Sequence, residues 1–143
     1  MAPSMIEGLT LAYGSSKTEN MNTAAANDDE EMTMAINYVN GGLSVGYQQS
    51  EVQSGTAGAN GNNVEEFGIA FAINENLSVS YNQADNEDDA PSSTNITEDS
   101  SGISAAYTMG SASFRIAINE ASNVNGVSGS DDENMELSLK LSF

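Results

Sequence analysis

The sequence predicts an all-β fold, an antiparallel up-and-down transmembrane β-barrel to which this chain contributes eight strands. Three observations predict it: an alternating final stretch, a strand motif that recurs along the chain, and connections that alternate between short and long. The chain has 143 residues, which is enough for one domain. Residues 1–143 are therefore predicted to form a single β-barrel domain.

The final stretch, residues 135–143, is apolar at every odd position and polar or charged at every even position. Alternation with a period of two places the apolar side chains on one face of a strand and the polar ones on the other. A strand that crosses a membrane in a barrel needs about nine to eleven residues of this kind. The stretch thus predicts a membrane-crossing strand that ends on Phe143.

A five-residue strand motif begins at Leu9 and recurs at Leu43 and Leu77, with a spacing of 34 residues. Each copy reads apolar, polar, apolar, small, tyrosine, and a related segment begins at Ala112. Each copy is followed by a polar stretch and then by a second alternating segment. These partner segments are residues 32–38, 67–73, 103–109 and 135–143. The chain is therefore predicted to form four hairpins.

The connections between the predicted strands alternate in length. Residues 40–42, 74–76 and 110–111 are short and rich in Asn and Gly, which favour tight turns. Residues 15–31, 50–63, 84–101 and 121–133 are longer and polar, and nearly all of the acidic residues are expected in these loops. Short turns at one end and long loops at the other are typical of an outer-membrane barrel, with the short turns on the periplasmic side.

The tyrosines are predicted to form two aromatic girdles at the two membrane interfaces. One girdle is expected at the long-loop ends of strands and the other at the short-turn ends, the second including Phe143. The girdle tyrosines are Tyr13, Tyr47, Tyr81, Tyr38 and Tyr107.

Composition excludes several classes of function. The chain has neither Cys nor His and carries 3 basic against 21 acidic residues, for a net charge of −18. Nucleic-acid binding is not expected, because phosphates would be repelled. No catalytic constellation is present, so we expect no enzyme, cofactor or metal site, and we interpret the acidic clusters as a solvated rim. Three charges fall within predicted strands on the polar face, and we predict that they line a pore: Arg115, Glu136 and Lys140.

The strand pattern and the terminal strand resemble a Gram-negative outer-membrane general porin, specifically the C-terminal eight strands of a sixteen-stranded barrel. The resemblance covers the whole chain as a pattern, without a sharp motif. It implies a passive, water-filled channel for ions and small hydrophilic solutes in the outer membrane, surrounded by lipid and assembled as a homotrimer. It also implies that the last strand is recognised by the barrel-assembly machinery through Leu137, Leu139, Leu141 and Phe143.

Two alternatives stay open. A small eight-stranded outer-membrane barrel with a structural or adhesive role has the same number of strands, but the inward positions are mostly Gly, Ala, Ser and Thr, which would leave its lumen unfilled. A soluble β-sandwich also has one apolar face per sheet. No apolar run is long enough for a transmembrane helix. No signal peptide precedes the first strand, so we expect a mature chain or a fragment.

Overall fold

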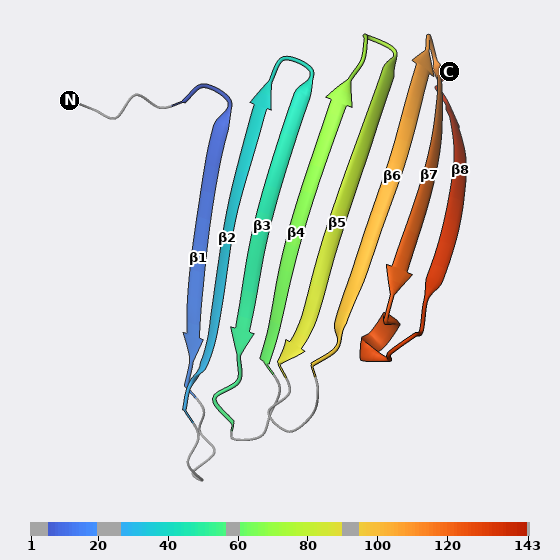
Figure 1. Cartoon of the computed structure of the whole chain (residues 1–143). Helices are drawn as coiled ribbons and strands as arrows, with labels where there is room; N and C mark the ends of the chain where they lie inside the picture. Colours follow the sequence, from blue (N-terminus) through green and yellow to red (C-terminus); the bar gives the residue numbers. More distant parts are fainter. Residues whose placement is uncertain (1–5, 20–26, 57–60, 90–94, 143) are drawn as a thin grey trace, which may run out of the picture.

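The computed structural model describes residues 6–19, 27–56, 61–89 and 95–142. Eight antiparallel strands lie side by side in one sheet, and each strand pairs only with its neighbours in the sequence (Figure 1). The predicted all-β class and the eight up-and-down strands are confirmed. The strands are β1 (Leu9–Thr18), β2 (Asp29–Asn40), β3 (Leu43–Gln53), β4 (Gly61–Ala72), β5 (Leu77–Asp89), β6 (Thr97–Met109), β7 (Ala112–Ser122) and β8 (Asp132–Leu141).

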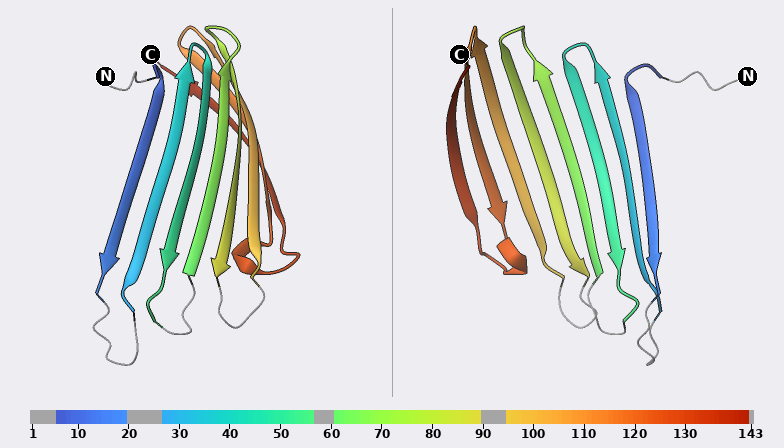
Figure 2. Two further views of the ribbon diagram at one scale, coloured as in Figure 1. Left: turned by 60° about the vertical axis from the view of Figure 1, so that its left-hand side comes forward. Right: turned by 180° about the vertical axis from the view of Figure 1, so that it is seen from behind.

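The sheet does not close into a barrel. β1 and β8 are its two edges, and no pairing joins them in the described part of the chain. Figure 2 shows a single curved layer, and its curvature over eight strands does not bring the edges together. The predicted strand order is therefore present, whereas the described residues form an open sheet.

The strands extend further toward the long connections than the alternation predicted. β2 begins at Asp29 rather than Met32, and β5 continues through the acidic stretch to Asp89. The expectation that the acidic residues lie in loops is thus wrong for most of those in the described residues, which lie at strand ends. The reason is that backbone hydrogen bonds hold the ladder together, so it can continue where the side chains stop alternating.

The short turns lie where they were predicted, and all three are at one end of the sheet, here called the short-turn end; the other is the long-connection end. Gly41 and Gly110 have φ of 57° and 59°, in the left-handed region that glycine adopts without strain. The turn between β4 and β5 is held by Asn74, whose Oδ1 accepts from the N–H groups of Asn76 and Leu77, both at 2.9 Å. In the connection before β8, the short 3₁₀ turn η1 spans Val124–Gly126.

The register places all the alternating apolar residues on the same face of the sheet. One row of directly paired residues, Leu9, Tyr38, Val45, Ile69 and Tyr81, runs from β1 to β5 without a slip. A slip of one residue would reverse every side chain of a strand, so this agreement across the strands defines two distinct surfaces. We call the apolar surface the outer face and the opposite surface the inner wall.

The inner wall is the concave side of the sheet. Gly102 and Ala117 are buried and both belong to the inner wall, where curvature crowds the side chains. The outer face is convex, and its side chains spread apart: Ile103, which follows buried Gly102 on the interior strand β6, is 58% exposed.

The described residues contain almost no hydrophobic core. Ala117, at 3% exposure, is the one buried apolar side chain among them. The chain exposes 10270 Å² for a mass of 14.9 kDa, whereas a compact soluble monomer of that mass exposes about 7,000 Å². A sandwich would need a second sheet over the apolar face, and the described part of the chain has one sheet.

Candidate functional site

The inner wall is built mainly from small and hydrogen-bonding side chains, and Val39, Val52 and Val64 are its larger apolar residues. Hydroxyl pairs link neighbouring strands across it: Thr33 Oγ1 donates to Ser50 Oγ at 3.1 Å, and the Ser80 and Ser104 hydroxyls lie 2.8 Å apart. A surface of this composition is readily wetted, because it offers donors and acceptors and little apolar area.

One row of the inner wall consists almost entirely of asparagine and glycine. Successive strands contribute directly paired residues to this row, from β1 to β8. The row is Thr10, Asn37, Gly46, Gly68, Asn82, Gly102, Asn119 and Asn134. Sequence reasoning missed it, since the row exists only once the register of all eight strands is known.

The glycines of this row make room for the neighbouring amides. A Cβ on Gly102 would lie 2.6 Å from Asn119 Oδ1 and 2.9 Å from Asn82 Oδ1. Two amide oxygens from β5 and β7 therefore converge over the backbone of β6. At Gly68 nothing lies within 4 Å of such an atom, so the wall is open there.

The three predicted pore-lining charges all lie on the inner wall, on the last two strands. Glu136 pairs with Ala117, Arg115 with Ser138, and Lys140 with Ser113. They therefore follow one another toward the short-turn end in the order Glu136, Arg115, Lys140. In the described residues neither Arg115 nor Lys140 has a carboxylate within 4 Å. The two ion pairs found there are both formed by Lys17.

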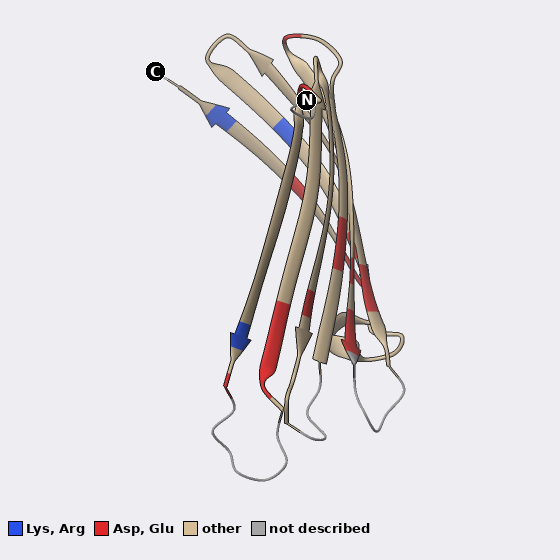
Figure 3. Cartoon of the chain, turned by 90° about the vertical axis from the view of Figure 1, so that its left-hand side faces the viewer, with Lys and Arg blue, Asp and Glu red and all other residues tan. Residues whose placement is uncertain are grey.

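Most of the negative charge lies toward the long-connection end, as Figure 3 shows. It is divided between the two surfaces. Glu66, Glu98 and Asp132 face the inner wall, in register with Ala84, Asn86 and Ala121. Three carboxylates of the outer face are direct neighbours on adjacent strands: Glu65, Asp85 and Asp99.

Lys17 is the one basic residue at this end. Its Nζ donates to Glu30 Oε1 at 2.7 Å and lies 3.4 Å from Asp28 Oδ2. Hydrogen bonds to Glu30 and then to Asp28 raise the pKa of Lys17 above its ordinary value. The positive charge of Lys17 is thus balanced by two neighbouring carboxylates, whereas Arg115 and Lys140 have no such ion pair in the described residues.

The predicted girdle tyrosines all lie on the outer face, although three of them are not at strand ends. Three of the tyrosines lie in the middle of their strands, four positions after the first residue: Tyr13, Tyr47 and Tyr81. They are not at the ends because the strands continue beyond them into polar residues. Tyr38 and Tyr107 lie two residues before the ends of β2 and β6. The structure adds aromatic neighbours that sequence reasoning did not include: Phe67 pairs with Tyr47, and Phe114 pairs with Tyr107.

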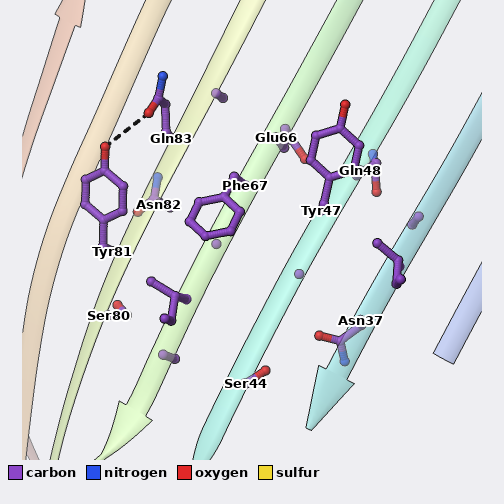
Figure 4. Close-up of a pocket in the computed structure, with 17 residues that line it drawn as sticks. Asn37, Ser44, Tyr47, Gln48, Glu66, Phe67, Ser80, Tyr81, Asn82 and Gln83 are labelled. Atoms are coloured by element: carbon purple, nitrogen blue, oxygen red, sulfur yellow. Dashed lines mark hydrogen bonds between the residues drawn. The ribbon is translucent and has the colours of Figure 1, made fainter. Parts of the chain in front are cut away.

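A hollow of about 590 Å³ lies against the middle of β2–β5 (Figure 4). Its lining includes residues of both surfaces, since the sheet is a single layer: Asn37, Ser80 and Asn82 belong to the inner wall, and Tyr47 and Tyr81 to the outer face. The Tyr81 hydroxyl donates to Gln83 Oε1 at 3.2 Å, an arrangement in which an apolar ring ends in a hydrogen-bonded group.

The predicted assembly residues lie on the free edge strand β8. Leu137, Leu139 and Leu141 alternate on the outer face at 62%, 65% and 53% exposure. Phe143 lies outside the described residues. These leucines are an uncovered apolar row on an edge strand of the sheet.

The described residues hold no group of three metal-ligating side chains placed to bind a metal ion. In the same part of the chain, no helix has the length and hydropathy needed to cross a bilayer. Comparisons with protein-family models, with curated proteins and with solved structures find no match to this chain.

Proposed function

We propose that this chain forms part of the wall of an outer-membrane porin, a passive and water-filled channel for ions and small hydrophilic solutes. The observation that carries the proposal is the division of one uncovered sheet into an apolar convex face and a polar concave wall. Outer-membrane lipid would cover the first and water would fill the second. This division is what a barrel that encloses an aqueous channel requires.

Covering the outer face accounts for the exposed apolar side chains. Large exposed apolar patches mark sites that contact a membrane or another protein. Here the patch spans all eight strands and is bordered by tyrosines toward the long-connection end. Beyond them the same face becomes acidic, at Glu65, Asp85 and Asp99. An apolar band between aromatic residues and charged ends is typical of a strand that crosses a bilayer.

The inner wall favours a barrel with more than eight strands. An eight-stranded lumen is filled by its own side chains, but Gly46, Gly68 and Ala70 are too small to fill it. β1 and β8 each have one open side and also require partners there, because open edges are not tolerated in the hydrocarbon region. β1 and β8 run in opposite directions, so strands added between them can continue the antiparallel order. The small side chains speak against the alternative of a complete eight-stranded barrel with an adhesive role.

The proposal extends to the partners implied by the porin resemblance. The leucines of β8 would present the strand to the barrel-assembly machinery, and the barrel would form homotrimers. Both are tested on protein isolated from the outer membrane, by deletion at the end of β8 and by cross-linking in detergent.

The primary test combines location with conductance. We expect the protein in the outer-membrane fraction, soluble only in detergent, and we expect stepwise conductance when it is added to a planar lipid bilayer. A monodisperse monomer in plain buffer would contradict the proposal. So would outer-membrane protein that never conducts.

A further inference from the structure

Four residues on the inner wall near the short-turn end form a square. On β7 and β8, Ser113 pairs with Lys140 and Arg115 pairs with Ser138. The two cations occupy one diagonal and the two hydroxyls the other. Diagonal neighbours on adjacent strands lie about 7–8 Å apart, within reach of long side chains. The heads of Arg115 and Lys140 can therefore meet over the two serines.

In the described residues no carboxylate lies within 4 Å of either cation of this square, although Glu136 is a diagonal neighbour of Arg115, as Lys140 is. On β6, Ala106 and Thr108 face it, and the Thr108 hydroxyl donates to Ser113 Oγ at 3.2 Å. Glu136 is the nearest carboxylate along β8, two residues toward the long-connection end from Ser138. It forms no ion pair with Arg115. In a chain of net charge −18, two of the three basic residues are thus adjacent, and neither forms an ion pair within the described residues.

We propose that Arg115 and Lys140, with Ser113 and Ser138, bind a small oxyanion of the phosphate type on the inner wall. Arg115 presents a planar fork of donors that matches two oxyanion oxygens, and Lys140 adds a compact positive charge. The serine hydroxyls complete a set of donors around the anion. This inference rests on the proposed function in one respect: the inner wall must be open to water and solutes.

The charge along the wall gives the site a direction. Glu66, Glu98 and Asp132 lie toward the long-connection end, where they repel an anion. An oxyanion reaches Arg115 and Lys140 more readily from the short-turn end. Glu136 marks the boundary between the two regions, and beyond it an anion meets increasing negative potential.

The site is tested on the whole protein, folded in a neutral detergent, by the ³¹P line width of inorganic phosphate. The wild type broadens the signal in a saturable way. Arg115→Gln and Lys140→Gln each weaken binding by roughly three- to fivefold, as expected for exposed charge pairs, and the double variant abolishes it. Lys17→Gln removes the same charge from the long-connection end and leaves binding unchanged. If all three substitutions weakened phosphate binding equally, binding would depend on the net charge of the protein alone, and the proposed site would be overturned.

A bilayer measurement separates this inference from the channel proposal. Phosphate reduces chloride conductance through the wild type, and through Lys17→Gln, but not through the double variant. Conductance that phosphate does not affect, with no ³¹P broadening, overturns the site and leaves the channel. Saturable broadening without any conductance overturns the channel and leaves the site.

A lipid headgroup carries the same phosphate chemistry, so its contribution is measured separately. Binding of inorganic phosphate is repeated in phosphatidylcholine nanodiscs with and without phosphatidylglycerol. Equal binding supports a site for a free solute on the inner wall. If phosphatidylglycerol weakened the binding of inorganic phosphate, Arg115 and Lys140 would be binding lipid headgroups, and the inference would be overturned.

Discussion

Gly8 lies so close to Val39 that no side chain fits between them. The Val39 N–H donates to the Gly8 carbonyl at 2.9 Å, and a Cβ on Gly8 would lie 1.9 Å from the Val39 oxygen. Gly8 also has a φ of 83°, in the left-handed region that other residues rarely adopt. Since Gly8 immediately precedes β1, this contact fixes the start of the edge strand against the end of β2.

Replacing Gly8 with Ala should therefore destabilise the sheet. The left-handed backbone alone costs about 1–3 kcal/mol for a residue with a side chain, and the clash with Val39 adds to this. Urea unfolding of the detergent-folded protein measures the loss. Gly68→Ala is the control, because nothing lies within 4 Å of the new methyl group. Equal stability of the two variants would contradict this role for Gly8.

Placing a charge on either surface should distinguish lipid from water. Ile69 lies on the outer face between Val45 and Tyr81, and its neighbour Ala70 lies on the inner wall between Ser44 and Ser80. Ile69→Arg should destabilise the protein folded in lipid vesicles by about 2–4 kcal/mol, the cost of Arg at the bilayer midplane. Ala70→Arg should change it little. A reversed order would place the lipid on the concave side.

Ion preference should depend on the carboxylates of the inner wall. Substituting Glu66, Glu98 and Asp132 with the corresponding amides should reduce cation preference, measured as the reversal potential under a salt gradient. The effect should be largest at low ionic strength, since exposed charges are screened within about 10 Å at 0.1 M salt. The matched set Glu65, Asp85 and Asp99 removes three charges from the outer face and should have less effect. A larger effect of this outer set would mean that the wall does not line the path.

The end of β8 should govern assembly. Deleting Phe143 should lower the amount of folded, heat-modifiable protein in the outer membrane, as should replacing Leu139 with Ser. Heat modifiability on gels checks both variants, with Ser138→Ala as a control on the opposite surface. Normal assembly of the Phe143 deletion would make the terminal aromatic residue incidental.

Much of this fold could be predicted from the sequence, because alternation and turn residues are local signals. The motifs beginning at Leu9, Leu43 and Leu77 predict three strands, and glycine at 41 and 110 predicts two of the turns. The strand ends were underestimated where residues such as Asp85 and Glu87 break the apolar alternation. There the backbone ladder continues regardless of side-chain type.

The candidate site was only partly predictable. Arg115, Glu136 and Lys140 could be assigned to the polar face, since each lies on an alternating strand. The square with Ser113 and Ser138 could not, because it depends on the register between β7 and β8. The asparagine and glycine row depends on seven such registers together. Pairing between strands is a long-range property that no local pattern contains.

The pairing of each strand only with its sequence neighbours has a consequence for how this molecule can form and change. Closing a hairpin brings together residues that are close along the chain, so the entropy lost at each step is small. The sheet can therefore grow one hairpin at a time. With motifs repeating every 34 residues, duplication of one hairpin would preserve the register of all others. Such a sheet can gain strands in evolution by duplication of a gene segment, without change to its existing strands.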